Sequence, residues 1–126
     1  MFPAVLQVAL GGAIGATLRY LAGLWAVRML GHTPFPVAIL AVNVLGSFLM
    51  GLFIGAAAQK GLTHLAPLVA TGILGGFTTF SAFSLEAVTL YERGDLTAAA
   101  LYVGLSVGLS ILALVAGLWV ARGAFA

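Results

Sequence analysis

Residues 75–84 read Gly-Gly-Phe-Thr-Thr-Phe-Ser-Ala-Phe-Ser, so a glycine pair, four hydroxyls and three phenylalanines stand inside an otherwise apolar stretch. A helix in lipid normally satisfies its backbone internally, whereas Gly75-Gly76 followed by Thr78-Thr79 favours an opening of the helix. The freed carbonyls must then find protein, an ion or water. Because broken helices at membrane depth usually mark transport sites, we expect the function of the chain to lie here.

Phe80 and Phe83 are three residues apart, so both rings project from the same side of the helix just after the glycine pair. Aromatic edges are electropositive, and a dehydrated anion lying against them would be held without a full positive charge. The alternative interpretation is an ordinary packing pair. The neighbouring hydroxyls favour a site, and Thr79 and Ser81 are expected to support it.

Asn43 is the only asparagine in the chain and is flanked by two valines. Its amide can donate a hydrogen bond to an anion. The competing role is a hydrogen bond between helices, typically worth ~0.6 kcal/mol in membranes, and the sequence leaves both roles open. Gly46, Gly51 and Gly55 on the same helix are interpreted as positions of close helix packing.

Tyr102, Ser106 and Ser110 follow one another at four-residue spacing, which predicts a stripe of hydroxyls along one helix face. Hydroxyls can bind an anion without a permanent charge, although the serines could also bond back to their own helix. Gly104 and Gly108 have the GxxxG spacing and are interpreted as helix contact points.

Arg19 and Glu86 are the charges placed deepest within apolar stretches, and such charges are functional candidates by default. They lie at similar depth, so they could pair with each other. Alternatively, Arg19 would raise the anion concentration at a vestibule, while Glu86 would cap a hydrogen-bond network. We assign Glu86 a supporting role.

Composition excludes a soluble domain, because 63% of the 126 residues are hydrophobic and only eight are charged. The ranges 2–29, 35–58, 65–90 and 96–121 are each long enough to cross the ~30 Å hydrocarbon core as a helix. The sequence thus predicts an all-α integral membrane protein, with residues 1–126 as one domain of four transmembrane helices. We expect the third helix to be broken near its middle.

Enzyme activity is not expected, because no histidine lies at the membrane level of the serines and the sequence contains no cysteine. Paired metal-ligand spacing, a phosphate-binding glycine loop and a basic patch are not found either. The sequence therefore favours transport over catalysis and over nucleic-acid binding.

Loop charges do not choose an orientation. Lys60 and Arg122 fall on one side, and Arg28 and Arg93 fall on the other, so the positive-inside rule predicts insertion in both directions. The polar residues of the four helices all lie toward the Arg28 side. One chain would therefore offer a polar path through only half the membrane, and we expect an antiparallel, dual-topology homodimer.

Three motifs together resemble the Fluc fluoride channels, also called CrcB proteins, over the whole chain. The motifs are residues 75–84, Val-Asn-Val-Leu-Gly-Ser-Phe at 42–48 and Gly-Gly-Ala-Ile-Gly-Ala-Thr-Leu-Arg-Tyr at 11–20. The resemblance implies an antiparallel dimer with two pores in the cell inner (plasma) membrane. It implies passive export of fluoride from the cytoplasm, and so fluoride resistance.

The resemblance also implies roles for individual residues. The phenylalanine pair, the asparagine and the polar track would line the fluoride pore: Phe80, Phe83, Asn43, Tyr102, Ser106 and Ser110. Glu86 corresponds to the pore-associated acid and Arg19 to the arginine near the vestibule. Main-chain carbonyls of Gly75 and Thr78 from both subunits would bind a structural sodium ion at the dimer centre.

The main alternative is a small proton-coupled multidrug cation exporter, which is also short and often antiparallel. Such a carrier needs an acid within the membrane, and Glu86 is the only interior carboxylate of the chain. Its position late in the third helix, rather than in the first, disfavours this alternative. A membrane scaffold without transport is the other hypothesis, and flux of any ion would argue against it.

Overall fold

The computed structural model describes residues 3–124, and the ordered elements within this range are all helices. In chain order these are α1 (Ala4–Leu30), α2 (Val37–Lys60), the 3-10 helix η1 (Thr63–Leu65), the π-helix η2 (Pro67–Leu74), α3 (Gly75–Phe77), α4 (Phe80–Glu92) and α5 (Leu96–Ala124). Four stretches are long and apolar enough to cross a membrane, and the third runs from Thr63 to Glu92 through the break. The predicted all-helical fold with four such helices is confirmed.

Helix ends differ slightly from the predicted ranges. α1 and α2 end at Leu30 and Lys60, where we expected 29 and 58, and α5 continues to Ala124 rather than 121. Gly61 follows α2 in the left-handed conformation with φ 68°, and this ends the helix because glycine adopts positive φ without a steric penalty. The predicted start of the first helix at Phe2 lies outside the described residues.

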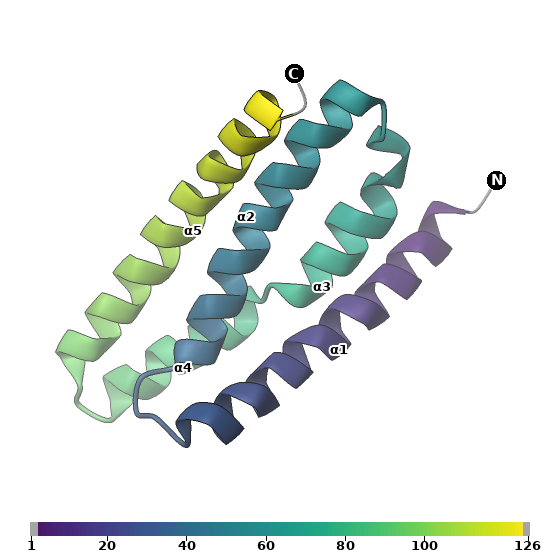
Figure 1. The fold of residues 1–126 in the computed structure, drawn as a ribbon. Coiled ribbons are helices and arrows are strands. Elements are labelled where there is room, and N and C mark those ends of the chain that lie inside the picture. Colours follow the sequence, from purple (N-terminus) through teal and green to yellow (C-terminus); the bar gives the residue numbers. More distant parts are fainter. Residues whose placement is uncertain (1–2, 125–126) are drawn as a thin grey trace.

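Figure 1 shows how the spans are arranged. The start of α1, the end of α5 and the α2–η1 connection lie at one end of the molecule, and the α1–α2 and α4–α5 connections lie at the other. α2 packs mainly on α5, while α1 packs mainly on η2 and α3. The broken third span joins these two helix pairs, because η2 and α3 belong to one pair and α4 contacts α5.

The α1 pair is held together by backbone contact. The only buried residues of α1 are Gly11 and Gly15. A Cβ atom added at Gly15 would lie 2.0 Å from the carbonyl oxygen of Ile73, and one added at Gly11 would lie 2.3 Å from that of Leu68. Gly72 and Gly76 meet α1 in the same way, and we call the contact made at these four glycines the glycine seam. Small residues permit this approach, which drives helix association in lipid, where burial of apolar side chains gains little.

The α2–α5 pair uses the same principle at other positions. Added Cβ atoms at Gly51 and Gly55 would lie 2.1 Å from the Leu114 carbonyl oxygen and 2.7 Å from the Ala121 Cβ. The prediction that these glycines are close-packing positions is confirmed. Gly104 and Gly108 were also expected to be contact points, but within this chain a Cβ at either would meet nothing within 4 Å. These two glycines therefore contact no other helix within a single chain, and their expected role would need a second chain.

Candidate functional site

The third span breaks at its two threonines. Thr78 and Thr79 have extended backbones, with φ −83° and ψ 156° at the first and φ −151° and ψ 115° at the second. Gly75 remains helical with φ −63° and ψ −36°. The third span is therefore broken near its middle and within the predicted motif, but the opening lies at the threonines and not at the glycine pair. Gly76 instead permits close contact with α1, because a Cβ there would lie 2.9 Å from the Gly12 carbonyl oxygen.

Thr79 restarts the helix after the break. Its side-chain oxygen accepts a hydrogen bond from the Ala82 N–H at 3.1 Å, which is the usual function of a threonine at a helix N-terminus. Thr78 closes the preceding half-helix, since its hydroxyl donates to the Leu74 carbonyl at 2.9 Å. β-Branched threonines also favour extended backbone, so the local sequence explains where the span opens.

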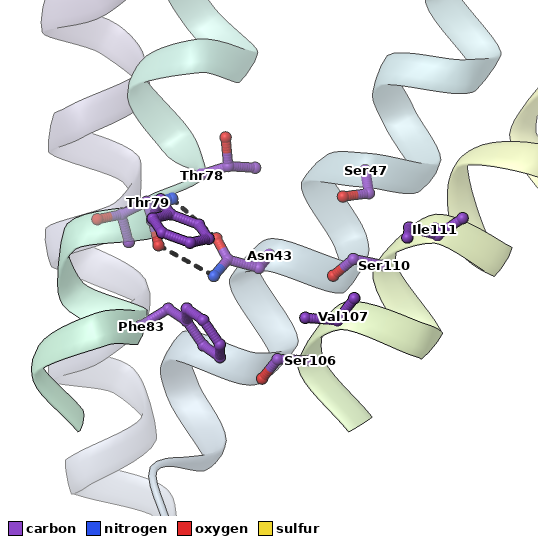
Figure 2. A pocket seen from close by; sticks show the side chains of 10 residues that line it. Asn43, Ser47, Thr78, Thr79, Phe83, Ser106, Val107, Ser110 and Ile111 are labelled. Atoms are coloured by element: carbon purple, nitrogen blue, oxygen red, sulfur yellow. Dashed lines mark hydrogen bonds between the residues drawn. The ribbon is translucent and has the colours of Figure 1, made fainter. Parts of the chain in front are cut away.

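Asn43 of α2 bonds to the opened backbone. Its Nδ2 donates to the Thr79 carbonyl at 3.1 Å, and its Oδ1 accepts from the Thr79 N–H at 2.8 Å, as Figure 2 shows. The side-chain amide oxygen thereby replaces the helical acceptor that the Thr79 N–H loses at the break, and the amide N–H adds a second donor to the carbonyl that begins α4. Of the two roles left open by the sequence, the hydrogen bond between helices is present, and one N–H of the amide remains for a further acceptor.

Arg19 approaches the break from α1, on another side. Its Nε donates to the carbonyl oxygen of Gly76 at 3.2 Å, and the side chain is half-buried. Glu86 lies elsewhere, in a second cavity of about 290 Å³ that is also lined by His32 and Thr33 near the α1–α2 connection. Within residues 3–124 Arg19 and Glu86 form no ion pair with each other, so this alternative from the sequence does not apply.

Aromatic rings extend from the break along α4 to α5. The centroids of Phe80 and Phe83 are 5.3 Å apart with a 51° angle between the ring planes, and Phe83 lies 5.4 Å from Tyr102. The two phenylalanines share a side of α4, as their spacing predicted. They differ in burial, however, because Phe80 is 76% exposed and Phe83 only 8%. Phe83 belongs to the core with Leu90 and Tyr102, whereas Phe80 is available for contact.

A cavity of about 250 Å³ lies between the break, α2 and α5. Its lining residues are Asn43, Ser47, Thr78, Thr79, Phe80, Phe83, Ser106, Val107, Ser110 and Ile111. We call this cavity the hydroxyl groove. None of these ten side chains is charged. The groove therefore combines amide, hydroxyl and aromatic groups in one neutral site.

The hydroxyls along α5 have few protein partners. The side-chain oxygens of Tyr102, Ser106 and Ser110 are buried and form no hydrogen bond of acceptable geometry among the described residues, although the Tyr102 and Ser106 hydroxyls lie close to each other. Ser106 and Ser110 therefore do not bond back to their own helix, which was the alternative interpretation. A buried hydroxyl without a partner is costly, so these groups are expected to bind something that a single chain does not supply.

The structure separates the predicted site residues into two groups. Those in the hydroxyl groove are Asn43, Phe80, Phe83, Ser106, Ser110, Thr78 and Thr79. Tyr102 contacts the Phe83 ring, and the Ser81 hydroxyl lies 3.3 Å from that of Thr79, but neither residue lines the groove. Arg19, Glu86 and Gly75 also lie outside its lining.

Sequence reasoning did not select three lining residues, Ser47, Val107 and Ile111. Ser47 follows Asn43 by four residues and so shares its helix face, which is a signal that could have identified it. Val107 and Ile111 directly follow the predicted site residues Ser106 and Ser110. Both have apolar side chains, so the sequence contains no signal that would have identified them.

Neutral donors and aromatic edges are suited to a small, partly dehydrated anion, because they attract it without the strong binding of a full cation. Fold and site together define a multi-pass helical membrane protein with an uncharged, hydroxyl-lined cavity beside a broken helix.

The chain belongs to the CrcB family, since the family model described as CrcB-like protein, Camphor Resistance (CrcB), matches residues 6–118. A protein of Ruegeria sp. (strain TM1040) is 67% identical over 123 residues, which is 98% of each chain. A Roseobacter denitrificans protein is 64% identical over 122 residues, or 96% of this chain and 97% of the relative. A protein of Jannaschia sp. (strain CCS1) is 71% identical over 104 residues, which cover 79% of this chain and 99% of the relative. Each is named fluoride-specific ion channel FluC, and the family resemblance read from the sequence is confirmed.

Proposed function

We propose that this protein is a fluoride-selective channel that lets fluoride leave the cytoplasm passively and so gives fluoride resistance. The observation that supports it is the hydroxyl groove, whose lining offers hydrogen-bond donors and aromatic edges but no charged group. The relatives are named fluoride-specific ion channels, which supports fluoride as the transported ion. No catalytic step enters this function, and we expect the protein to reside in the inner (plasma) membrane.

Fluoride would exchange its hydration shell for protein groups one at a time along the groove. The free amide N–H of Asn43 and the hydroxyls of Ser106 and Ser110 replace water as donors. The edge of Phe80 supplies a weak positive field, and because no cation lies in the path, the anion can leave again. Glu86 and Tyr102 support the path from outside the lining.

A second copy in the opposite orientation would complete the path. Phe80 and Ile111 line the groove yet are 76% and 61% exposed, so one side of the groove is open in a single chain. The balanced loop charges allow both orientations to insert, and an antiparallel partner would extend the polar path across the other half of the membrane. Two copies contain two grooves, and we therefore propose a homodimer with two pores.

We also propose a structural sodium ion at the break between the two half-helices. In a continuous helix the Thr79 and Ala82 N–H groups would donate to the carbonyls of Gly75 and Thr78, but here they donate to Asn43 Oδ1 and Thr79 Oγ1. Both carbonyls therefore lose their helical donors. Hard cations take oxygen ligands, and two copies of the chain would provide four such carbonyls. Bound there, sodium would stabilise the break without being transported.

The function is tested by reconstituting purified protein into fluoride-loaded liposomes, adding a potassium ionophore and following external fluoride with an electrode. Chloride-loaded vesicles are the matched control. We expect rapid fluoride loss with little chloride loss, as a neutral groove with strong donors favours the smaller anion. Absence of fluoride release from vesicles shown to contain dimers would overturn the proposal. The proposed cation site is tested separately by thermal melts of the purified protein in sodium and in N-methylglucamine. We expect the protein to melt at a lower temperature without sodium.

A further inference from the structure

Arg19 continues the face of α1 that forms the glycine seam. It follows Gly11 and Gly15 at four-residue spacing, so all three lie in one row along the helix. The two glycines bring α1 to backbone contact with η2 and α3, and Arg19 extends from the end of this row to the break. Its position is therefore fixed by the closest helix contact on this side of the molecule.

The group that Arg19 contacts is created by the break. In a continuous helix the carbonyl of Gly76 would accept the N–H of Phe80, but the extended threonines between them prevent this. The Arg19 Nε supplies a donor at 3.2 Å instead. An unpaired carbonyl within the apolar layer is costly, and a positive charge beside the C-terminal end of a helix is favourable, so both effects favour this contact.

Side chains from two helices thus form hydrogen bonds to the backbone on either side of the break. Arg19 of α1 holds the last turn before it, and Asn43 of α2 holds Thr79 just after it. Phe80, the first residue of α4, follows directly, so the direction of its ring depends on both contacts. We infer that Arg19 is a positioning residue for the fluoride path: its Nε–H, bound to the Gly76 carbonyl, sets the orientation of Phe80. The inference rests on the proposed function.

Three substitutions separate the donor from the charge. In Arg19→Gln the first side-chain nitrogen is still attached to Cδ, so an N–H remains at the matching position but the charge is lost. Arg19→Lys keeps the charge and moves the donor one atom further out. Arg19→Met removes both. Arg28→Met, on an exposed residue of the same helix, controls for the loss of a cation.

We expect the maximum fluoride flux of Arg19→Gln to stay within about threefold of wild type, while Lys and Met variants fall at least about tenfold. Flux is measured against fluoride concentration at two ionic strengths, on equal amounts of folded protein. A vestibule charge would give the opposite order, with Lys near wild type and Gln as low as Met, and with a loss that grows at low salt. That result, or equal flux in all variants, overturns the inference.

Hydrogen exchange gives a readout that does not need flux. The Met variant should speed amide exchange at residues 76–82 and leave the remaining helices unchanged, and the Gln variant should not. If wild type conducts no fluoride, the proposed function fails, while local exchange still decides whether Arg19 holds the break. Should the Met variant not fold, the order of Gln and Lys alone distinguishes a donor from a charge.

Discussion

The glycine seam and the hydroxyl groove lie on different sides of the same helix break and differ in what fills them. In the seam, backbone meets backbone, and added Cβ atoms at Gly11 and Gly15 would lie within 2.3 Å of carbonyl oxygens. In the groove, about 250 Å³ remains between side chains, and buried hydroxyls have no partner among the described residues. The seam leaves no space for a side chain, whereas the groove leaves space for a ligand.

The largest effect is expected from filling the seam. Gly15→Ala places a Cβ 2.0 Å from the Ile73 carbonyl oxygen, and since backbone cannot rotate away, the free energy of unfolding should fall by at least ~3 kcal/mol. Gly12→Ala is the matched control, because a Cβ there meets nothing within 4 Å. Thermal melts of both purified variants check this. Equal stability of the two would show that the seam is not rigid.

A second experiment compares the buried Phe83, which is expected to act in packing, with the exposed Phe80, which is expected to act in fluoride transport. Phe83 is 8% exposed, so Phe83→Ala should cost about 3 kcal/mol of stability as a large core truncation does. Phe80 is 76% exposed, so Phe80→Ile should change stability by no more than about 0.5 kcal/mol. The same Phe80 variant should lose at least about tenfold in fluoride flux. Unchanged flux in correctly assembled protein would remove Phe80 from the mechanism.

The smallest change in stability is expected in the groove hydroxyls. Ser110→Ala removes a buried oxygen that has no partner among the described residues, so the melting temperature should stay equal or rise slightly, while fluoride flux falls a few-fold. Thr17→Val removes a hydroxyl that bonds only to its own helix, at Ala13, and should leave flux unchanged. A clear loss of stability in Ser110→Ala would mean that the hydroxyl is structural.

The sequence by itself determined the class of fold. Apolar stretches of membrane length with so few charges allow only helices that satisfy their own backbone, and four such helices are present in the described part of the chain. Spacing along single helices also sufficed to place Phe80 beside Phe83 and to align Ser106 with Ser110, because helical geometry fixes such neighbours without reference to the rest of the molecule.

Only the tertiary structure decided which side chains form hydrogen bonds to the backbone at the break. The glycine pair and the two threonines were expected to open the span together, but Gly76 stays helical in close contact with α1, and only Thr78 and Thr79 are extended. Asn43 and Arg19 are each far from the break in sequence, so their bonds to it follow from which helices pack together. Local periodicity describes one helix at a time, whereas the partner of a freed backbone group depends on the neighbouring helix.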